Sequence, residues 1–461
     1  MKHRIHLALL ATLVTVPGWA QDLSVSTTTI AQRWTQDTNG FDKATYTPVT
    51  EFVGVDANGL AGNDALSVHV YGWGLRDLSD ASSVAGRTNG DLTYAYMQYH
   101  FDQANAEIKG GRFTVNDGVR NEQVDGVEGR TDLRYGFSVS AFGGTPVLFK
   151  NLSNNPQADN SFQHDMIAGG RLGWHTAKLG EIGVSYLMDG SQAAYQYGPA
   201  MPVDYTRREV GTDLRLTPCS FITVTGRTVF DVAAHPQPAA GTDPSRIAEH
   251  DYKATAKLTE TISLTGSFTE RNYYAYYAGT TLPSLFNQNE QGMFKATGGS
   301  LVWGPAAKWQ VVADVRRTER GIEGNSTRAG ADLRYTDAEK HFLAGGGYHR
   351  VNAFEAASLG FLTPAYGLSH DEMRAWVMTQ HGACSASLDA IRMFYADSGK
   401  NPNLNGQATE TAVVGSLGYQ AKSNLKLSGD LTVEDTPLYR KQTTGLVRVE
   451  YQFALAGKGG K

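Results

Sequence analysis

Between Leu425 and Glu434 the chain reads LKLSGDLTVE, in which apolar or glycine residues alternate with polar ones at every step. Successive side chains of a β-strand point to opposite faces, so this segment would place an apolar row on one face and a polar row on the other. A helix would mix the two rows, because its apolar positions recur every three or four residues. The segment is therefore predicted to be an amphipathic strand.

The same alternation recurs along the chain. It is present in ISLTGSFT at 262–269, in WQVVADVR at 309–316, in TRAGADLRY at 327–335 and in VRVEYQF at 447–453. The expected strands are about 10–13 residues long, whereas strands of globular proteins usually have about 5–6. A tilted strand that crosses an outer membrane needs about 9–11 residues. A soluble sandwich with one wet face would also alternate, but the strand length favours a membrane barrel.

Short and long connections follow one another between these strands. Short turns are predicted near 102–104, 176–178, 217–220, 259–261, 304–307, 337–340, 381–383 and 421–423. Long connections are predicted at 145–161, 190–203, 233–246, 271–291, 351–369 and 397–409, and the strand boundaries are least defined between 105 and 143. Short periplasmic turns and long extracellular loops are typical of outer-membrane barrels. The sequence therefore predicts an all-β fold, a single antiparallel transmembrane β-barrel of about 22 strands (range roughly 18–24) with both termini periplasmic.

The N-terminus predicts export. A basic start of Lys2, His3 and Arg4 precedes a largely apolar run and the small-residue site Gly18-Trp19-Ala20. This order is typical of a secretory signal peptide, and the apolar run is shorter than the roughly 18 residues that a membrane-spanning helix needs. We expect residues 1–20 to be the signal peptide, 21–453 the barrel and 454–461 a short periplasmic tail.

Composition excludes several classes of protein. The formal net charge is -5 and the basic residues are scattered, which argues against nucleic-acid binding. The chain has two cysteines, so its fold does not depend on a network of disulfides. Cys219 and Cys384 belong to hairpins far apart in the sequence, and we expect free thiols rather than a bridge.

The signal peptide, the Gly- and Tyr-rich alternating strands and the terminal strand ending at Phe453 resemble the Gram-negative outer-membrane porin superfamily. The resemblance covers essentially the whole mature chain and implies a β-barrel in the bacterial outer membrane that acts in transport. It also implies that Phe453 is part of the signal read by the barrel-assembly machinery, although residues 454–461 follow it here. Gly111-Arg112-Phe113 and Val124-Asp125-Gly126-Val127 loosely resemble an early hairpin of alginate-export porins, and no functional residue is carried over from that likeness.

Motifs for catalysis or cofactor binding are not present in the sequence. It has no Cys-x-x-Cys-His haem attachment site, no Gly-rich phosphate loop, no His-Glu-x-x-His and no Gly-x-Ser-x-Gly. The richest polar cluster is Ser369-His370-Asp371-Glu372. A solvated loop end explains it better than a metal or hydrolase site does. We therefore expect a protein that is not an enzyme and carries no cofactor of its own.

The polar face of the strands is the expected lining of a pore. Charged side chains on a lipid face cost about 2–4 kcal/mol at mid-bilayer for Arg or Lys, so alternation assigns them to the lumen. The residues assigned in this way are ten cations and six carboxylates: Arg171, Asp213, Arg215, Arg227, Lys253, Lys257, Asp314, Arg316, Arg328, Asp332, Arg334, Lys426, Asp430, Glu434, Arg448 and Glu450. The excess of cations predicts a weak anion preference. Opposite charges on neighbouring strands, such as Asp314 and Arg328, are alternatively expected to pair.

The expected width leaves two functional interpretations open. A barrel of about 22 strands usually encloses a plug, and alternation from about Leu23 leaves no N-terminal plug domain. Long loops folded inward, especially 145–161, 271–291 and 351–369, would give a porin for passive diffusion of small polar solutes. A separate partner inside would give the sheath of a porin–cytochrome conduit, with a multihaem cytochrome encoded elsewhere as the partner. An integral outer-membrane enzyme is the third class, and the oligomeric state is left open.

Overall fold

The computed structural model describes residues 20–36, 44–79, 87–116, 118–119, 121–147, 166–189, 207–232, 247–272, 293–319, 325–353, 369–396, 404, 406–436 and 441–456. The predicted signal peptide, except Ala20, and most of each predicted long connection lie outside the described residues. No helix among the described residues is both long and apolar enough to cross a membrane.

Nearly all of the described chain is β-strand, as the alternation predicts. The strands are β1 (Asp22–Gln36), β2 (Ala44–Tyr46), β3 (Pro48–Leu60), β4 (Asn63–Asp77), β5 (Thr88–Phe101), β6 (Ala106–Asn116), β7 (Asn121–Asp132), β8 (Phe137–Pro146), β9 (Ile167–Thr176), β10 (Gly180–Asp189), β11 (Arg207–Cys219), β12 (Ile222–Asp231), β13 (Ile247–Lys257), β14 (Ile262–Asn272), β15 (Met293–Ala306), β16 (Trp309–Glu319), β17 (Asn325–Asp337), β18 (Phe342–Ala353), β19 (His370–His381), β20 (Cys384–Tyr395), β21 (Thr409–Lys422), β22 (Leu425–Asp435) and β23 (Gln442–Ala456). Two short 3-10 turns, η2 (Asp102–Ala104) and η3 (Arg134–Gly136), follow β5 and β7.

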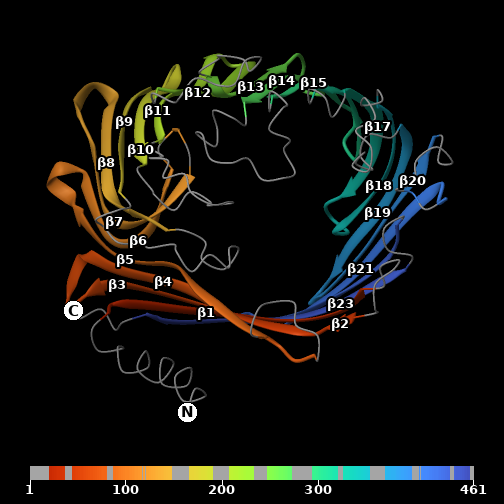
Figure 1. Cartoon of the computed structure of the whole chain (residues 1–461), viewed down its shortest axis with the longest axis horizontal. Helices are drawn as coiled ribbons and strands as arrows, with labels where there is room; N and C mark the ends of the chain where they lie inside the picture. Colours follow the sequence, from red (N-terminus) through yellow and green to blue (C-terminus); the bar gives the residue numbers. More distant parts are fainter. Residues whose placement is uncertain are drawn as a thin grey trace, which may run out of the picture.

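The strands form one closed antiparallel barrel. Each strand pairs with its neighbours in the chain, and β1 closes the ring on β23 in a register that runs from Asp22↔Ala456 to Trp34↔Thr444 (Figure 1). Only Thr47 separates β2 from β3, and both pair with β1, so the 23 strand segments of the described residues make 22 strands. The predicted fold class and strand number are confirmed. Strand β23 continues past Phe453 to Ala456.

Tight turns occupy one end of the barrel. Each of the eight predicted short turns lies where two consecutive paired strands are connected, and six of the predicted ranges overlap the end of the first strand. Two further tight turns connect β3 to β4 and β7 to β8. At this end the Lys308 ammonium lies 2.8 Å from the Asp337 carboxylate, which links the turn after β15 to the end of β17. That hydrogen bond raises the pKa of Lys308 above its ordinary value.

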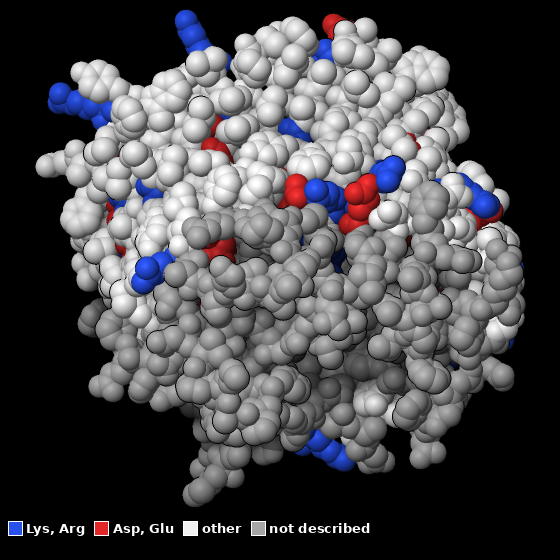
Figure 2. Space-filling view, turned by 45° about the horizontal axis from the view of Figure 1, so that its top comes forward, with Lys and Arg blue, Asp and Glu red and all other residues white. Residues whose placement is uncertain are grey.

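The two faces of the barrel differ in polarity. Large apolar side chains with high exposure lie on one face, for example Leu417 at 71% and Val447 at 58%. Figure 2 shows a surface with few charged groups over much of the described part; some acidic and basic side chains lie next to each other, and others stand alone. Backbone groups in lipid must be satisfied within the protein, so a closed barrel with an apolar outer face is the β-structure that crosses an outer membrane. The expected bacterial outer-membrane location is confirmed.

Strand β6 leaves the barrel wall halfway along its length. Its pairing with β5 ends at Ala95↔Arg112, although β5 extends from there to Thr88 and β6 to Asn116. The departure frees carbonyl groups on β5, and side chains of the departing hairpin supply donors for two of them. Arg112 donates to Leu92 O at 3.0 Å, and Gln123 donates to Thr93 O. Unsatisfied backbone groups are costly, so these two contacts stabilise the split.

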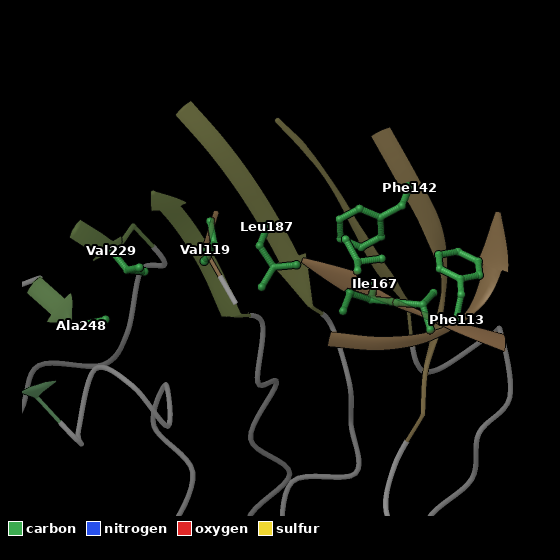
Figure 3. Packing of buried hydrophobic residues seen from close by; sticks show 9 residues of the cluster. Phe113, Val119, Phe142, Ile167, Leu187, Val229 and Ala248 are labelled. Carbon is green, nitrogen blue, oxygen red and sulfur yellow. The ribbon is translucent and has the colours of Figure 1, made fainter. Parts of the chain in front are cut away.

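The end of the β6–β7 hairpin folds over the inner face of the strands that follow. Phe113, Val115, Val119 and Val124 from the hairpin pack with apolar residues of the wall in one buried cluster. The wall residues of this cluster are Phe142, Ile167, Leu187, Val229 and Ala248, from β8, β9, β10, β12 and β13 (Figure 3). Val124 and Ile167 are fully buried. The hairpin therefore has an apolar core of its own inside the barrel.

Glycines permit the bend. Gly111, Gly126 and Gly144 are register partners across β6, β7 and β8 and form one row. A Cβ on Gly111 would overlap Ala95 O, and one on Gly126 would overlap Gly143 O. Gly111 also has φ +127°, a conformation that disfavours residues with a Cβ. The sheet can turn inward here because this row has no side chains.

Gly111→Ala should destabilise the folded barrel by about 1–3 kcal/mol, because the methyl group meets backbone and the positive φ becomes strained. Urea unfolding in lipid vesicles measures the change. Gly129→Ala in β7 is the matched control, since a Cβ at Gly129 meets nothing within 4 Å. Equal stability of the two variants would show that the row does not control the bend.

Candidate lumenal site

All sixteen charged residues predicted to line the pore lie on one face of the barrel. Directly paired residues of an antiparallel sheet point to the same side, so the registers can be followed from strand to strand around the ring. From β9 to β12, Arg171 pairs with Ser185, Ser185 with Gly211, and Gly211 with Val229. On β22 and β23, Lys426 pairs with Glu450. This face is opposite to the one that carries Leu417 and Val447, and we refer to it as the inner face.

A recess of about 680 Å³ lies on the inner face beside the hairpin end. The hairpin contributes Asn116, Gly118 and Asn121, and the wall contributes residues of β7 to β13. The charged residues of the lining are Arg130, Arg171, Glu181, Asp213, Arg215, Arg227, Asp251 and Lys253. Five of them (Arg171, Asp213, Arg215, Arg227 and Lys253) were predicted from alternation to line the pore, and the structure brings these five together.

Arg171 is the centre of an ion-pair network in this recess. Its guanidinium binds Asp213 through Nε at 3.0 Å and Nη2 at 2.6 Å, and Glu181 through Nη2 at 2.7 Å. The side chain of Arg171 is 14% exposed. Glycines make room for it, because a Cβ at Gly183 would lie 2.5 Å from Arg171 Nε. Such charge-assisted, two-pronged contacts fix the guanidinium in position.

A second network lies on the same face, next to the first. Glu249, whose side chain is 2% exposed, accepts hydrogen bonds from Arg227 at 2.8 Å and from Arg271 at 3.1 Å. Glu249 was not among the residues predicted to line the pore, although it lies an even number of residues from Lys253 on β13 and shares its face. Alternation extended along the whole of β13 would have found it.

Charges on the inner face of strands β16 to β23 are largely paired. Asp314 accepts from Arg328 at 3.0 Å, which confirms the predicted pair, and it lies 2.9 Å from His349 Nε2. Arg328 also lies 3.3 Å from Glu372. The other pairs on the inner face include Arg334–Asp332 at 3.5 Å, Arg374–Asp389, Lys426–Glu450 at 3.9 Å and Arg448–Glu450 at 3.7 Å. Within the described chain these strands are therefore close to electrical balance.

The excess of cations inferred from alternation disappears in the structure. The further cations on the inner face of the described strands are Lys109, Arg130, Arg271 and Arg374. The further carboxylates on the inner face outnumber these four cations. They include Glu181, Glu209, Asp231, Glu249, Asp251 and Glu372. A general excess of positive charge therefore gives no basis for the weak anion preference.

Neither the polar cluster nor the cysteines form a site. His370 and Glu372 lie on the inner face and Asp371 on the outer face, where it accepts from Arg350 at 2.8 Å and from Tyr348 at 2.6 Å. The three side chains do not converge, and the described residues include no group of His, Cys, Asp and Glu that could hold a metal ion. Cys219 ends β11 and Cys384 begins β20, and both are free thiols.

Comparison with known proteins supports the fold alone. No family model and no curated protein matches the chain. Among solved structures, the ferric enterobactin receptor PfeA of Pseudomonas aeruginosa is similar with a TM-score of 0.52 and 8% identity, over 93% of this chain and 80% of that one. The P pilus usher PapC translocation pore (TM-score 0.49, 8% identity, 94% of this chain and 99% of that one) and OccAB4 of Acinetobacter baumannii (0.44, 9%, 95% and 100%) are more weakly similar. The fold is that of outer-membrane β-barrels.

The position of the hairpin end can be tested by a cysteine pair. The Cβ of Val119 lies 3.6 Å from the position of a Cβ on Gly211, within the range of about 3.5–4.5 Å found in disulfides. We expect Val119→Cys with Gly211→Cys, in a chain whose two native cysteines are replaced by serine, to form a bridge on oxidation. Non-reducing mass spectrometry of tryptic peptides detects it.

The control pairs Val119→Cys with Thr212→Cys, because Thr212 is the next residue of β11 and points to the opposite face. This pair should stay reduced. Equal bridging in both variants would mean that the hairpin end is not seated on the inner face.

Proposed function

We propose that this chain is an outer-membrane channel for the passive diffusion of small polar solutes. The observation that carries the proposal is the β6–β7 hairpin, which is part of the wall and folds inside a 22-stranded ring. Barrels of 16–18 strands leave an aqueous channel, and wider ones usually enclose a plug. A hairpin packed on the inner face narrows the lumen without a plug domain.

The charged inner face supports the same proposal. We propose that the sixteen residues predicted from alternation line the path of the solute, together with Glu181, Asp251 and Arg130. Neighbouring groups of opposite charge hold water and small polar molecules in a lumen, and they make entry of apolar molecules unfavourable. The solutes that fit such a lining are small and polar.

The structure offers less support for the sheath interpretation. A sheath needs a lumen that is open along its length to hold a multihaem protein, and the hairpin end occupies part of that space. The predicted inward loops at 145–161, 271–291 and 351–369 lie mostly outside the described residues, so they do not enter the argument. No observation on the described residues favours a catalytic function over transport.

Release of the hairpin should widen the channel. Val115→Asp with Val119→Asp places two carboxylates in the apolar cluster, where burial of an unpaired charge is unfavourable, so the hairpin end should leave the wall. We expect the mean single-channel conductance in a planar bilayer to rise at least about twofold.

Thr114→Asp is the matched control, because Thr114 lies on the same hairpin but is exposed. Its conductance should equal that of the natural sequence. Heat-modifiable migration in SDS gels establishes that each variant is folded. A natural chain that gives no ohmic steps, or steps that only a periplasmic extract reduces, would contradict the proposal of a free diffusion channel.

A further inference from the structure

Three cations of the recess beside the hairpin have no ion-pair partner within the described chain. They are Arg130 on β7, Arg215 on β11 and Lys253 on β13. Arg215 and Lys253 are both register partners of Thr225 on β12, so they lie at one level on the inner face. Two strand spacings of about 4.8 Å separate their backbones. The two side chains therefore point into the same recess from positions roughly 10 Å apart.

Most carboxylates close to these cations are already engaged. Glu107, the register partner of Arg130, lies 3.1 Å from Lys109. Glu181 is the direct register partner of Arg215, and Asp213 is two residues from Arg215 on β11, but both bind Arg171. Glu249 is held by Arg227 and Arg271. Asp251 is the one carboxylate of the described lining without an ion pair, against three such cations. The recess thus has a local surplus of positive charge, although the inner face as a whole does not.

The rest of the lining is suited to an oxygen-rich molecule. Ser138, Ser140 and Thr225 supply hydroxyl groups, and Asn116 and Asn121 on the hairpin supply amides. The buried apolar cluster lies next to them, and Phe113, Val124, Phe142 and Ile167 are each at most 8% exposed. Low-dielectric walls strengthen the interaction of fixed cations with an anion. A volume of about 680 Å³ is in the range of small-molecule sites and exceeds what a single inorganic ion needs.

We propose that this recess is a binding site for a small organic dicarboxylate. One carboxylate is bound by Arg215 and the other by Lys253, while hydroxyl groups of β8 and β12 donate to the remaining oxygens. Guanidinium and ammonium groups on alternate strands match a molecule with two anionic ends better than a monovalent anion. The inference deepens the proposed channel function, because it names a class of solute that is held in the lumen.

Equilibrium binding tests the site without any need for conduction. Isothermal titration calorimetry of the detergent-solubilised full barrel with succinate should show one site. Arg215→Gln and Lys253→Gln should each weaken binding by about tenfold, which is the order expected for loss of one charge-assisted contact. Lys178→Gln is the control, because Lys178 is an exposed cation in the turn between β9 and β10. It should leave the affinity unchanged.

Acetate and inorganic phosphate are the comparison ligands, and each should bind at least about tenfold more weakly than succinate. Equal binding of all three would show a general anion patch and overturn the dicarboxylate class. No binding of succinate, or equal loss in the Lys178→Gln control, would overturn the site. Binding without ohmic conductance would refute the channel and leave the site intact, and conductance without binding would do the reverse.

Discussion

The hydrogen bonds that close β23 onto β1 are the constraint on which the rest of the structure depends. In lipid no water is available to backbone groups, so a sheet can cross the membrane only if it has no free edge. The register from Asp22↔Ala456 to Trp34↔Thr444 removes that edge. Closure also gives the sheet an inside and an outside, and this turns a simple alternation of residues into an apolar outer face and a charged inner face.

The hairpin of β6 and β7 is a local exception to that constraint, and its cost is offset in two ways. Side-chain donors on Arg112 and Gln123 reach Leu92 O and Thr93 O, which the departure of β6 leaves without their strand partner. Apolar residues on the hairpin pack against the inner face of the wall, where other strands present polar groups. Each apolar residue that leaves water contributes roughly 1–3 kcal/mol, so this cluster holds the hairpin inside the ring.

Electrostatics inside the barrel is decided pair by pair. A cation count for the lumen would predict attraction of anions everywhere, but most cations of β16 to β23 in the described chain have a carboxylate within 4 Å. Arg171 shows why local geometry matters, because it engages two carboxylates and thereby leaves Arg215 without one. The field that a solute meets therefore varies along the inner face rather than following the net charge of the chain.

Several properties of this protein can be predicted from its sequence because they repeat at every strand. The period of two in LKLSGDLTVE and its counterparts predicts strands, their length predicts a membrane barrel, and the alternation of short and long connections predicts the 22-stranded antiparallel order. The side on which each charged residue lies follows from the same period, which is why all sixteen predicted positions share one face. The residues Gly111-Arg112-Phe113 and Val124-Asp125-Gly126-Val127 were also noted in the sequence, as a loose resemblance to an early porin hairpin.

The inward turn of the β6–β7 hairpin and the recess beside it were decided only by tertiary structure. The inward turn depends on Gly111, Gly126 and Gly144 being register partners on three different strands, and no local pattern reports that alignment. The same holds for the recess, since its three cations without an ion pair in the described chain come from β7, β11 and β13. Arg215 has none there because Arg171 on β9 binds the two carboxylates beside it. Alternation assigns a residue to a face, but contacts across the lumen join strands whose distance in the sequence carries no signal.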